Sequence, residues 1–296
     1  MIYEVFHWTE YRYSESISLS EHALHLLPRD LPGQKVLSSS LELVPEPTAL
    51  HEHLDYFENR TTSFIIAEPH VGMHIKSRSR IDCDPRPSKP PASPLAWESV
   101  RAACAADECD RLALDFLYPS PYVPYLDELR EYAEPSFPKD RPFVEAVVEL
   151  NSRIHADFHF DRTATNVSTP LGELFRYRGG VCQDFAHLEI GCLRVLGLPA
   201  RYVSGYLQTE PLPGRPRLFG GDASHAWVSV YCPGQDWFDL DPTNNHVAGA
   251  GYLTLAWGRD YGDVSLVRGT LSGGGEHSLF LSVNVQTLDE ARPNSH

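Results

Sequence analysis

The sequence predicts an α+β protein in which an antiparallel β-sandwich-like domain precedes a domain of helices followed by strands. Three observations support this fold class. Polar and apolar residues alternate with a period of two early in the chain, residues 84–95 are rich in proline, and later helical patterns give way to strand-like segments. We therefore expect an all-β domain over 1–83, a proline-rich linker over 84–95, and a core domain with C-terminal strands over 96–296.

The N-terminal domain is predicted from short amphipathic strands. In residues 2–14, Tyr3 and Val5 fall on one face and Glu4 on the other, which is the pattern of a half-buried strand. Further strand-like runs, separated by proline, glycine and asparagine, cover residues 20–27, 35–44, 61–68 and 72–81. Strands of this kind favour a small antiparallel sandwich.

Proline marks the boundary between the two predicted domains. Residues 84–94 contain five prolines, which cannot continue a sheet and favour an extended connector. Helical patterns then cover residues 98–114, 126–132 and 143–158.

A strongly apolar helix begins near Cys182 and is predicted to lie at the centre of the core. It is apolar on nearly every side, Gly197 caps its C-terminus, and Pro199 prevents its continuation. Strand-like segments follow over residues 200–207, 226–232, 237–240 and 279–285.

Composition limits the classes of function. The chain has 296 residues and a net charge of −15, which disfavours a nucleic-acid partner. No run of about 18 apolar residues predicts a membrane span, and the N-terminal residues lack the pattern of a signal peptide. The six cysteines form no CxxC pair and the 14 histidines are scattered, so we expect no metal and no cofactor. Together these features predict a cytoplasmic protein with reduced thiols.

Cys182 has the surroundings of a reactive thiol. It follows the pair Gly179-Gly180 and opens the apolar helix, whose partial positive charge and free N–H groups stabilise a thiolate. Cys192 lies deeper in the same helix and is expected to be inert.

A base and an acid follow Cys182 along the chain. His225 opens an apolar strand, where it is held in position to take a proton from the thiol. An acid is also needed, to fix the imidazole tautomer and to stabilise its cation. Asp239 and Asp241 fall on the same face of the next strand, so periodicity alone leaves both as candidates.

Five blocks of sequence resemble the transglutaminase-like superfamily, specifically its bacterial cytosolic branch. The first contains Gly-Gly-Val-Cys-Gln-Asp and the fourth reads Asp-Pro-Thr-Asn-Asn; the blocks cover residues 178–187, 198–206, 223–228, 241–245 and 258–264. The resemblance implies a papain-like α+β core with Cys182 as nucleophile, His225 as base and Asp241 as orienting acid. It favours Asp241 over Asp239 because the family's acid precedes Pro-Thr. The first domain is similar to the family's N-terminal β-region.

An oxyanion hole requires hydrogen-bond donors close to the nucleophile. The backbone N–H of Cys182 is one expected donor. The superfamily often supplies a second donor from a side chain upstream of the cysteine, where this chain has phenylalanine on both sides of His159. His159 or Gln183 is therefore the expected substitute, and Trp227 is expected in the core or in the wall of the cleft.

The resemblance implies acyl chemistry at an amide bond through a thioester. We expect hydrolysis of a peptide or isopeptide, so that the substrate is a peptide-like or protein-like amide. Transglutaminase-type transfer to an amine begins with the same thioester and is the alternative. A non-catalytic binding module that retains the fold is the third possibility. The N-terminal domain is interpreted equally well as a recognition or dimerisation platform and as a packing partner, and the sequence predicts no oligomeric state.

Overall fold

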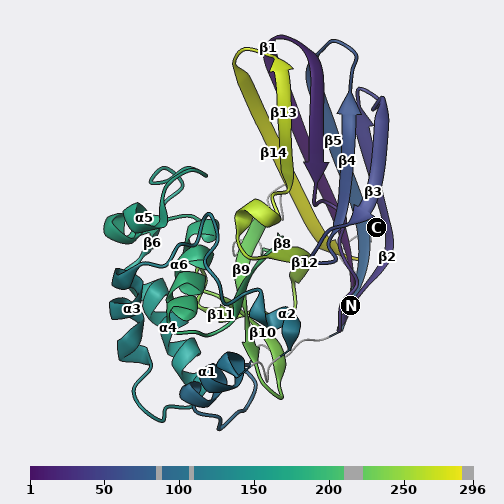
Figure 1. Cartoon of the computed structure of the whole chain (residues 1–296). Coiled ribbons are helices and arrows are strands. Elements are labelled where there is room, and N and C mark those ends of the chain that lie inside the picture. Colours follow the sequence, from purple (N-terminus) through teal and green to yellow (C-terminus); the bar gives the residue numbers. More distant parts are fainter. Residues whose placement is uncertain (85–88, 107–109, 210–222, 289–296) are drawn as a thin grey trace, which may run out of the picture.

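The N-terminal part of the chain forms a single curled antiparallel sheet. The computed structural model describes residues 1–84, 89–106, 110–209 and 223–288, so Cys109 and residues 85–88 of the expected linker lie outside it. The strands of this seven-stranded sheet are β1 (Ile2–Leu24), β2 (Gln34–Val44), β3 (Ala49–Leu54), β4 (Arg60–Ile66), β5 (His70–Cys83), β13 (Val267–Gly273) and β14 (His277–Thr287). The sandwich-like region is thus one sheet that curls (Figure 1).

Strand β1 bends and pairs with different partners along its length. Its first half pairs with β5 and β14, and its second half pairs with β4 and β13. Gly273, Gly274 and Gly275 all have positive φ and turn the chain between β13 and β14, beside the bend of β1 (Figure 1). A Cβ on Gly273 would lie 2.8 Å from the carbonyl oxygen of Ser16, so this corner requires glycine.

The pairing of β13 and β14 corrects the C-terminal end of the domain division. The sequence predicts C-terminal strands within the core over 96–296, whereas β13 and β14 pair with β1 in the N-terminal sheet. The reason is that β1 has an edge along which the returning chain completes backbone hydrogen bonds. Such a pairing between distant segments has no signal in local periodicity.

The core contains a five-stranded sheet, a short two-stranded sheet formed by β6 and β7, and the helices. The five-stranded antiparallel sheet has the order β11-β10-β9-β8-β12. Its strands are β8 (Ala200–Leu207), β9 (Ala223–Cys232), β10 (Asp236–Asp241), β11 (His246–Val247) and β12 (Tyr252–Gly258). The helices are α1 (Trp97–Ala105), α2 (Arg111–Leu114), α3 (Asp127–Ala133), α4 (Phe143–Asp157), α5 (Leu171–Tyr177) and α6 (Cys182–Val195), with 3₁₀ turns at Glu134–Ser136 and Tyr261–Asp263.

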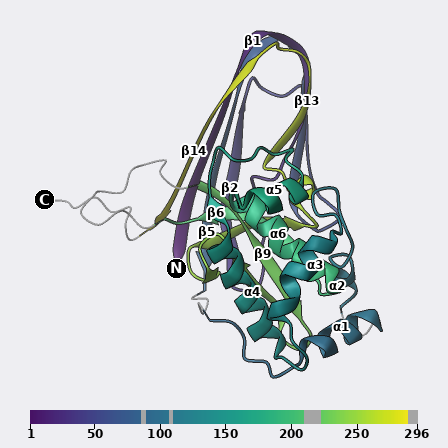
Figure 2. The ribbon, with the colours of Figure 1, turned by 90° about the vertical axis from the view of Figure 1, so that its left-hand side faces the viewer.

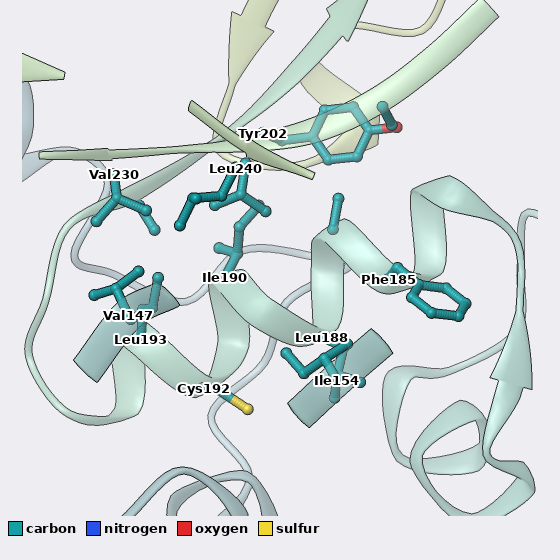
Figure 3. Packing of buried hydrophobic residues seen from close by; sticks show 14 of the residues in the cluster. Val147, Ile154, Phe185, Leu188, Ile190, Cys192, Leu193, Tyr202, Val230 and Leu240 are labelled. Carbon is teal, nitrogen blue, oxygen red and sulfur yellow. The ribbon is translucent and has the colours of Figure 1, made fainter. Parts of the chain in front are cut away.

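Helix α6 is central to the core, as its apolar sequence predicts. Helices α3 to α6 lie on one side of the five-stranded sheet (Figures 1 and 2). Ile190 and Leu193 of α6 pack against Val230 and Leu240 of the sheet, with Val147 of α4 beside them (Figure 3). Every residue of α6 from Asp184 to Val195 is buried, so the helix holds its first residues in a fixed position.

The N-terminal sheet packs directly against the core sheet. Tyr206 of β8 is hydrogen-bonded to His7 of β1, with 2.9 Å between the hydroxyl oxygen and Nδ1. The side-chain amide of Gln34 donates to the carbonyl oxygen of Thr254 in β12 and accepts its N–H. These buried contacts agree with the packing-partner interpretation of the N-terminal region.

Candidate active site

Two glycines bring the chain to the start of α6. Strand β7 (Gly179–Gly180) pairs in parallel with β6 (His159–Phe160). A Cβ on Gly179 would lie 2.6 Å from Nε2 of His159, and a Cβ on Gly180 would lie 2.5 Å from Oδ2 of Asp184. At Gly180 the carboxylate of Asp184 is held by hydrogen bonds and excludes a side chain, whereas at Gly179 the exposed ring of His159 would have to move.

Cys182 is the first residue of α6 and is partly exposed. The carboxylate of Asp184 accepts the N–H of Val181 at 2.8 Å and the hydroxyl of Thr165 at 2.6 Å, which secures the entry of the chain into the helix. Within the described ranges, the backbone N–H groups of Cys182 and Gln183 have no hydrogen-bond partner. Free N–H groups at a helix N-terminus attract an anion, either a thiolate or an oxyanion.

His225 lies in β9 opposite Gly205 of β8. Its Nε2 is 2.7 Å from Oδ2 of Asp241, and its side chain also interacts with that of Cys182. Because Asp241 occupies Nε2, the nitrogen left for Cys182 is Nδ1. The imidazole thus lies between the thiol at the start of α6 and the carboxylate at the end of β10. It can accept the proton of the thiol while the carboxylate stabilises the resulting cation.

Asp241 is fully buried and accepts five hydrogen bonds. Besides His225, Oδ2 accepts the side-chain amide of Asn244 at 2.6 Å and the hydroxyl of Tyr252 at 2.7 Å. The other oxygen, Oδ1, accepts the N–H groups of Thr243 and Asn244. Donors on all sides keep a buried carboxylate ionised and fix its direction.

Asn244 and Tyr252 are two site residues that are not predicted from the sequence. Asn244 lies three residues after Asp241, so its proximity was available as a local turn signal. Tyr252 is in β12, and no pattern in the sequence connects it with Asp241.

The structure separates the two acids that periodicity left open. The carboxylate of Asp239 accepts the indole N–H of Trp227 at 3.1 Å, whereas Asp241 accepts His225. Trp227, expected in the core or in the wall of the cleft, lies in the core. Its side chain is fully buried between His225 and Tyr252, and its only donor is already used.

His159 and Gln183, the two expected side-chain donors of the oxyanion hole, lie near the start of α6. His159 is exposed in β6, with its ring over Gly179. Gln183 is the second residue of α6 and is partly exposed. No hydrogen bond joins either side chain to Cys182 in the part of the chain that the structure describes.

The electrostatics of the site favour a charged imidazole. Burial alone lowers the pKa of His225, but its hydrogen bond to Asp241 and its interaction with Cys182, together with their charges, raise that pKa to about 10. Burial likewise raises the pKa of Asp241, and the bonds from His225, Asn244 and Tyr252 lower it below its ordinary value. An imidazolium between a carboxylate and a thiol is the arrangement that activates a cysteine nucleophile.

Among the described residues, no group of three His, Cys, Asp or Glu side chains is placed to hold a metal ion. In the same ranges, none of the helices is long and apolar enough to cross a membrane.

Comparison with known families matches both parts of the chain. Residues 3–82 match the bacterial transglutaminase-like N-terminal region, and residues 130–242 match the transglutaminase-like superfamily. Over 293 residues the chain is 40% identical to an uncharacterized protein of Mycobacterium tuberculosis, covering 96% of this chain and 92% of that protein.

Two further comparisons are with proteins that carry functional names. A segment of 119 residues is 33% identical to a protein-glutamine gamma-glutamyltransferase of Pseudomonas aeruginosa, covering 40% of this chain and 17% of that protein. The crystal structure of a candidate cysteine protease from Cytophaga hutchinsonii has the same fold, with a TM-score of 0.76 and 22% identity over 98% of this chain and 91% of that one.

Proposed function

Since the chain belongs to the transglutaminase-like superfamily, we propose that it is a cysteine-dependent enzyme that hydrolyses an amide bond of a peptide or isopeptide through a thioester. The observation that carries this proposal is the series Cys182–His225–Asp241. His225 interacts with the thiol and is hydrogen-bonded to a buried carboxylate that accepts five hydrogen bonds. An imidazole so oriented deprotonates a thiol and then protonates a leaving amine.

The reaction begins with attack of the Cys182 thiolate on the carbonyl carbon. A C–S bond forms, and the electron pair of the carbonyl moves to its oxygen, which becomes an oxyanion near the free N–H of Cys182. Collapse of this intermediate breaks the C–N bond, and the leaving amine takes a proton from the His225 imidazolium.

Water completes the cycle. Once Cys182 is acylated, its charge no longer raises the pKa of His225, so the imidazole becomes a more effective base for water. Water then attacks the thioester and gives a proton to His225, and the thiolate leaves as the acid product forms. Because Cys182 is partly exposed, water reaches this position without a second binding site.

Transfer of the acyl group to an amine is the second candidate function. It is favoured by the similarity of a 119-residue segment to the protein-glutamine gamma-glutamyltransferase of Pseudomonas aeruginosa. The two reactions share the thioester and differ only in whether water or an amine attacks it.

Mass spectrometry of the acyl-enzyme tests the proposal. After mixing with p-nitrophenyl acetate and rapid quenching, we expect one acetyl group on Cys182 and none in Cys182→Ala. A repeat with hydroxylamine, followed by detection of the hydroxamate, measures how well an amine competes with water. If Cys182 is never acylated and Cys182→Ala hydrolyses the ester as fast as the native protein, the enzyme proposal is wrong and a binding module becomes the better interpretation.

A further inference from the structure

Tyr202 of β8 has a hydroxyl that makes no hydrogen bond to the described residues and keeps some solvent contact. Its side chain is 3% exposed, and in the described ranges no donor or acceptor contacts its hydroxyl oxygen. Two other buried tyrosines near the site behave differently: Tyr206 is bonded to His7, and Tyr252 is bonded to Asp241. A hydroxyl that has no partner among the described residues and is not sealed from solvent is free to donate to a bound group.

The ring of Tyr202 is held in place by aromatic neighbours. Its centroid lies 5.1 Å from that of His187 in α6 and 6.5 Å from that of Tyr261. His187 is fixed in turn, because Tyr122 stacks on its other face and the N–H of Tyr261 donates to its Nε2 at 3.1 Å. The hydroxyl is therefore presented from a rigid support, as a preorganised catalytic donor must be.

The hydroxyl points toward the reactive end of α6. Figure 3 shows Tyr202 on the sheet above α6, with its oxygen directed toward the end of the helix where Phe185 lies, three residues after Cys182. Tyr202 interacts electrostatically with Cys182 and with Asp184, both of which lie at this end.

We propose that the hydroxyl of Tyr202 is the side-chain donor of the oxyanion hole, acting together with the free backbone N–H of Cys182. This inference rests on the proposed function. When the thiolate attacks, the carbonyl electron pair moves to oxygen, and the hydroxyl donates a hydrogen bond to that oxyanion without giving up its proton. The bond is made in the tetrahedral intermediate and its transition state, and it lowers the barrier to acylation.

The surroundings of Tyr202 suit a neutral donor. Burial, followed by the charge of Cys182 and of other nearby groups, raises the pKa of this hydroxyl well above its ordinary value. The phenol therefore stays protonated over the range in which the thiolate reacts, and it does not compete with His225 as a proton donor. His159 and Gln183, the donors expected from the sequence, are more exposed and lie outside this rigid cluster.

The test compares Tyr202→Phe with Tyr206→Phe, which removes a hydroxyl from the same strand but one that is bonded to His7. We expect kcat for p-nitrophenyl acetate hydrolysis to fall about 10²- to 10³-fold in Tyr202→Phe with little change in KM, and to change less than about threefold in Tyr206→Phe. Alkylation of Cys182 by iodoacetamide should keep its native rate in Tyr202→Phe, because alkylation forms no oxyanion.

The outcomes separate the two proposals. If hydrolysis depends on Cys182 but is unchanged in Tyr202→Phe, or if Gln183→Ala or His159→Ala shows the loss instead, the oxyanion inference is wrong and the proposed function stands. A parallel loss of alkylation in Tyr202→Phe would also overturn it, since the residue would then act on the thiol itself. If native hydrolysis does not depend on Cys182, the proposed function fails, and this inference fails with it.

Discussion

The two ends of α6 carry the same functional group in opposite environments. Cys182 opens the helix, is partly exposed, and interacts with the imidazole of His225. Cys192 is fully buried, and burial together with the charge of Glu189 raises the pKa of its thiol. The comparison shows that position in the fold gives two identical side chains different surroundings: one thiol lies beside an imidazole and is accessible, and the other is buried among apolar groups.

The largest expected effect comes from removing each thiol in turn. Cys182→Ala should reduce kcat/KM for ester hydrolysis by about 10⁴-fold or more, because the nucleophile is lost. Cys192→Ala should retain native activity and lose about 1 kcal/mol of unfolding free energy, because it leaves only a small cavity. Steady-state kinetics and urea denaturation measure the two effects. An active Cys182→Ala or a normally stable but inactive Cys192→Ala would reverse the comparison.

The next largest effect distinguishes the two acids of β10. Asp241→Asn should lower kcat on the order of 10³- to 10⁴-fold, because the amide no longer stabilises the imidazolium or fixes its tautomer. Asp239→Asn is the matched control; it weakens the bond to Trp227 and should cost about 1 kcal/mol of stability but less than tenfold in rate. A greater rate loss in Asp239→Asn would reassign the orienting acid.

A smaller effect is expected from the two neutral donors to Asp241. Tyr252→Phe and Asn244→Ala each remove one hydrogen bond to a charged group, worth about 1.5–3 kcal/mol. We expect kcat to fall roughly 10- to 100-fold in each variant, since every 1.4 kcal/mol of barrier is about a tenfold change in rate. Pre-steady-state acylation rates measure this directly. Unchanged rates would mean that the remaining bonds to Asp241 suffice.

The smallest effect on the site concerns the pH dependence of stability that arises from Glu189, a buried residue of α6 near Asp241. Burial, followed by the charge of Asp241, raises the pKa of Glu189 well above its ordinary value of 4.5, and neither of its oxygens has a hydrogen-bond partner in the described ranges. The folded state therefore holds a proton that the unfolded chain releases. The resulting stability is fully present below about pH 4.5 and is lost as pH rises toward the folded pKa.

Glu189→Gln keeps the shape of the side chain without its titration. The unfolding free energy of the variant should equal that of the native protein near pH 4. As pH rises, the variant should become more stable than the native protein, by at most about 1.4 kcal/mol per pH unit within that window. Urea unfolding at pH 4, 6 and 8 measures the difference, with the exposed Glu173→Gln as a control. Equal stability of the native protein and Glu189→Gln at pH 8 would show that Glu189 ionises without cost.

The features that were predictable from the sequence are the local ones. Apolar composition placed α6 at the centre, and the Gly-Gly pair marked its start, because both depend on residues close together in the chain. The pairing of β13 and β14 with β1, the bond from Tyr252 to Asp241 and the position of Tyr202 join segments that are far apart in sequence. Strand periodicity places Asp239 and Asp241 on one face of the strand. Only the three-dimensional structure shows that Asp241 bonds to His225 and Asp239 bonds to Trp227.

The most direct test of the central claim is the pH dependence of iodoacetamide alkylation, with every cysteine followed by peptide mapping. If Cys182 and His225 form a thiolate–imidazolium pair, Cys182 alone reacts rapidly at about pH 6, and His225→Ala removes this reactivity. Cys192 should remain unmodified in both proteins. If Cys182 is unreactive at that pH, or if His225→Ala alkylates at the native rate, the series Cys182–His225–Asp241 does not activate the thiol and the proposed mechanism is contradicted.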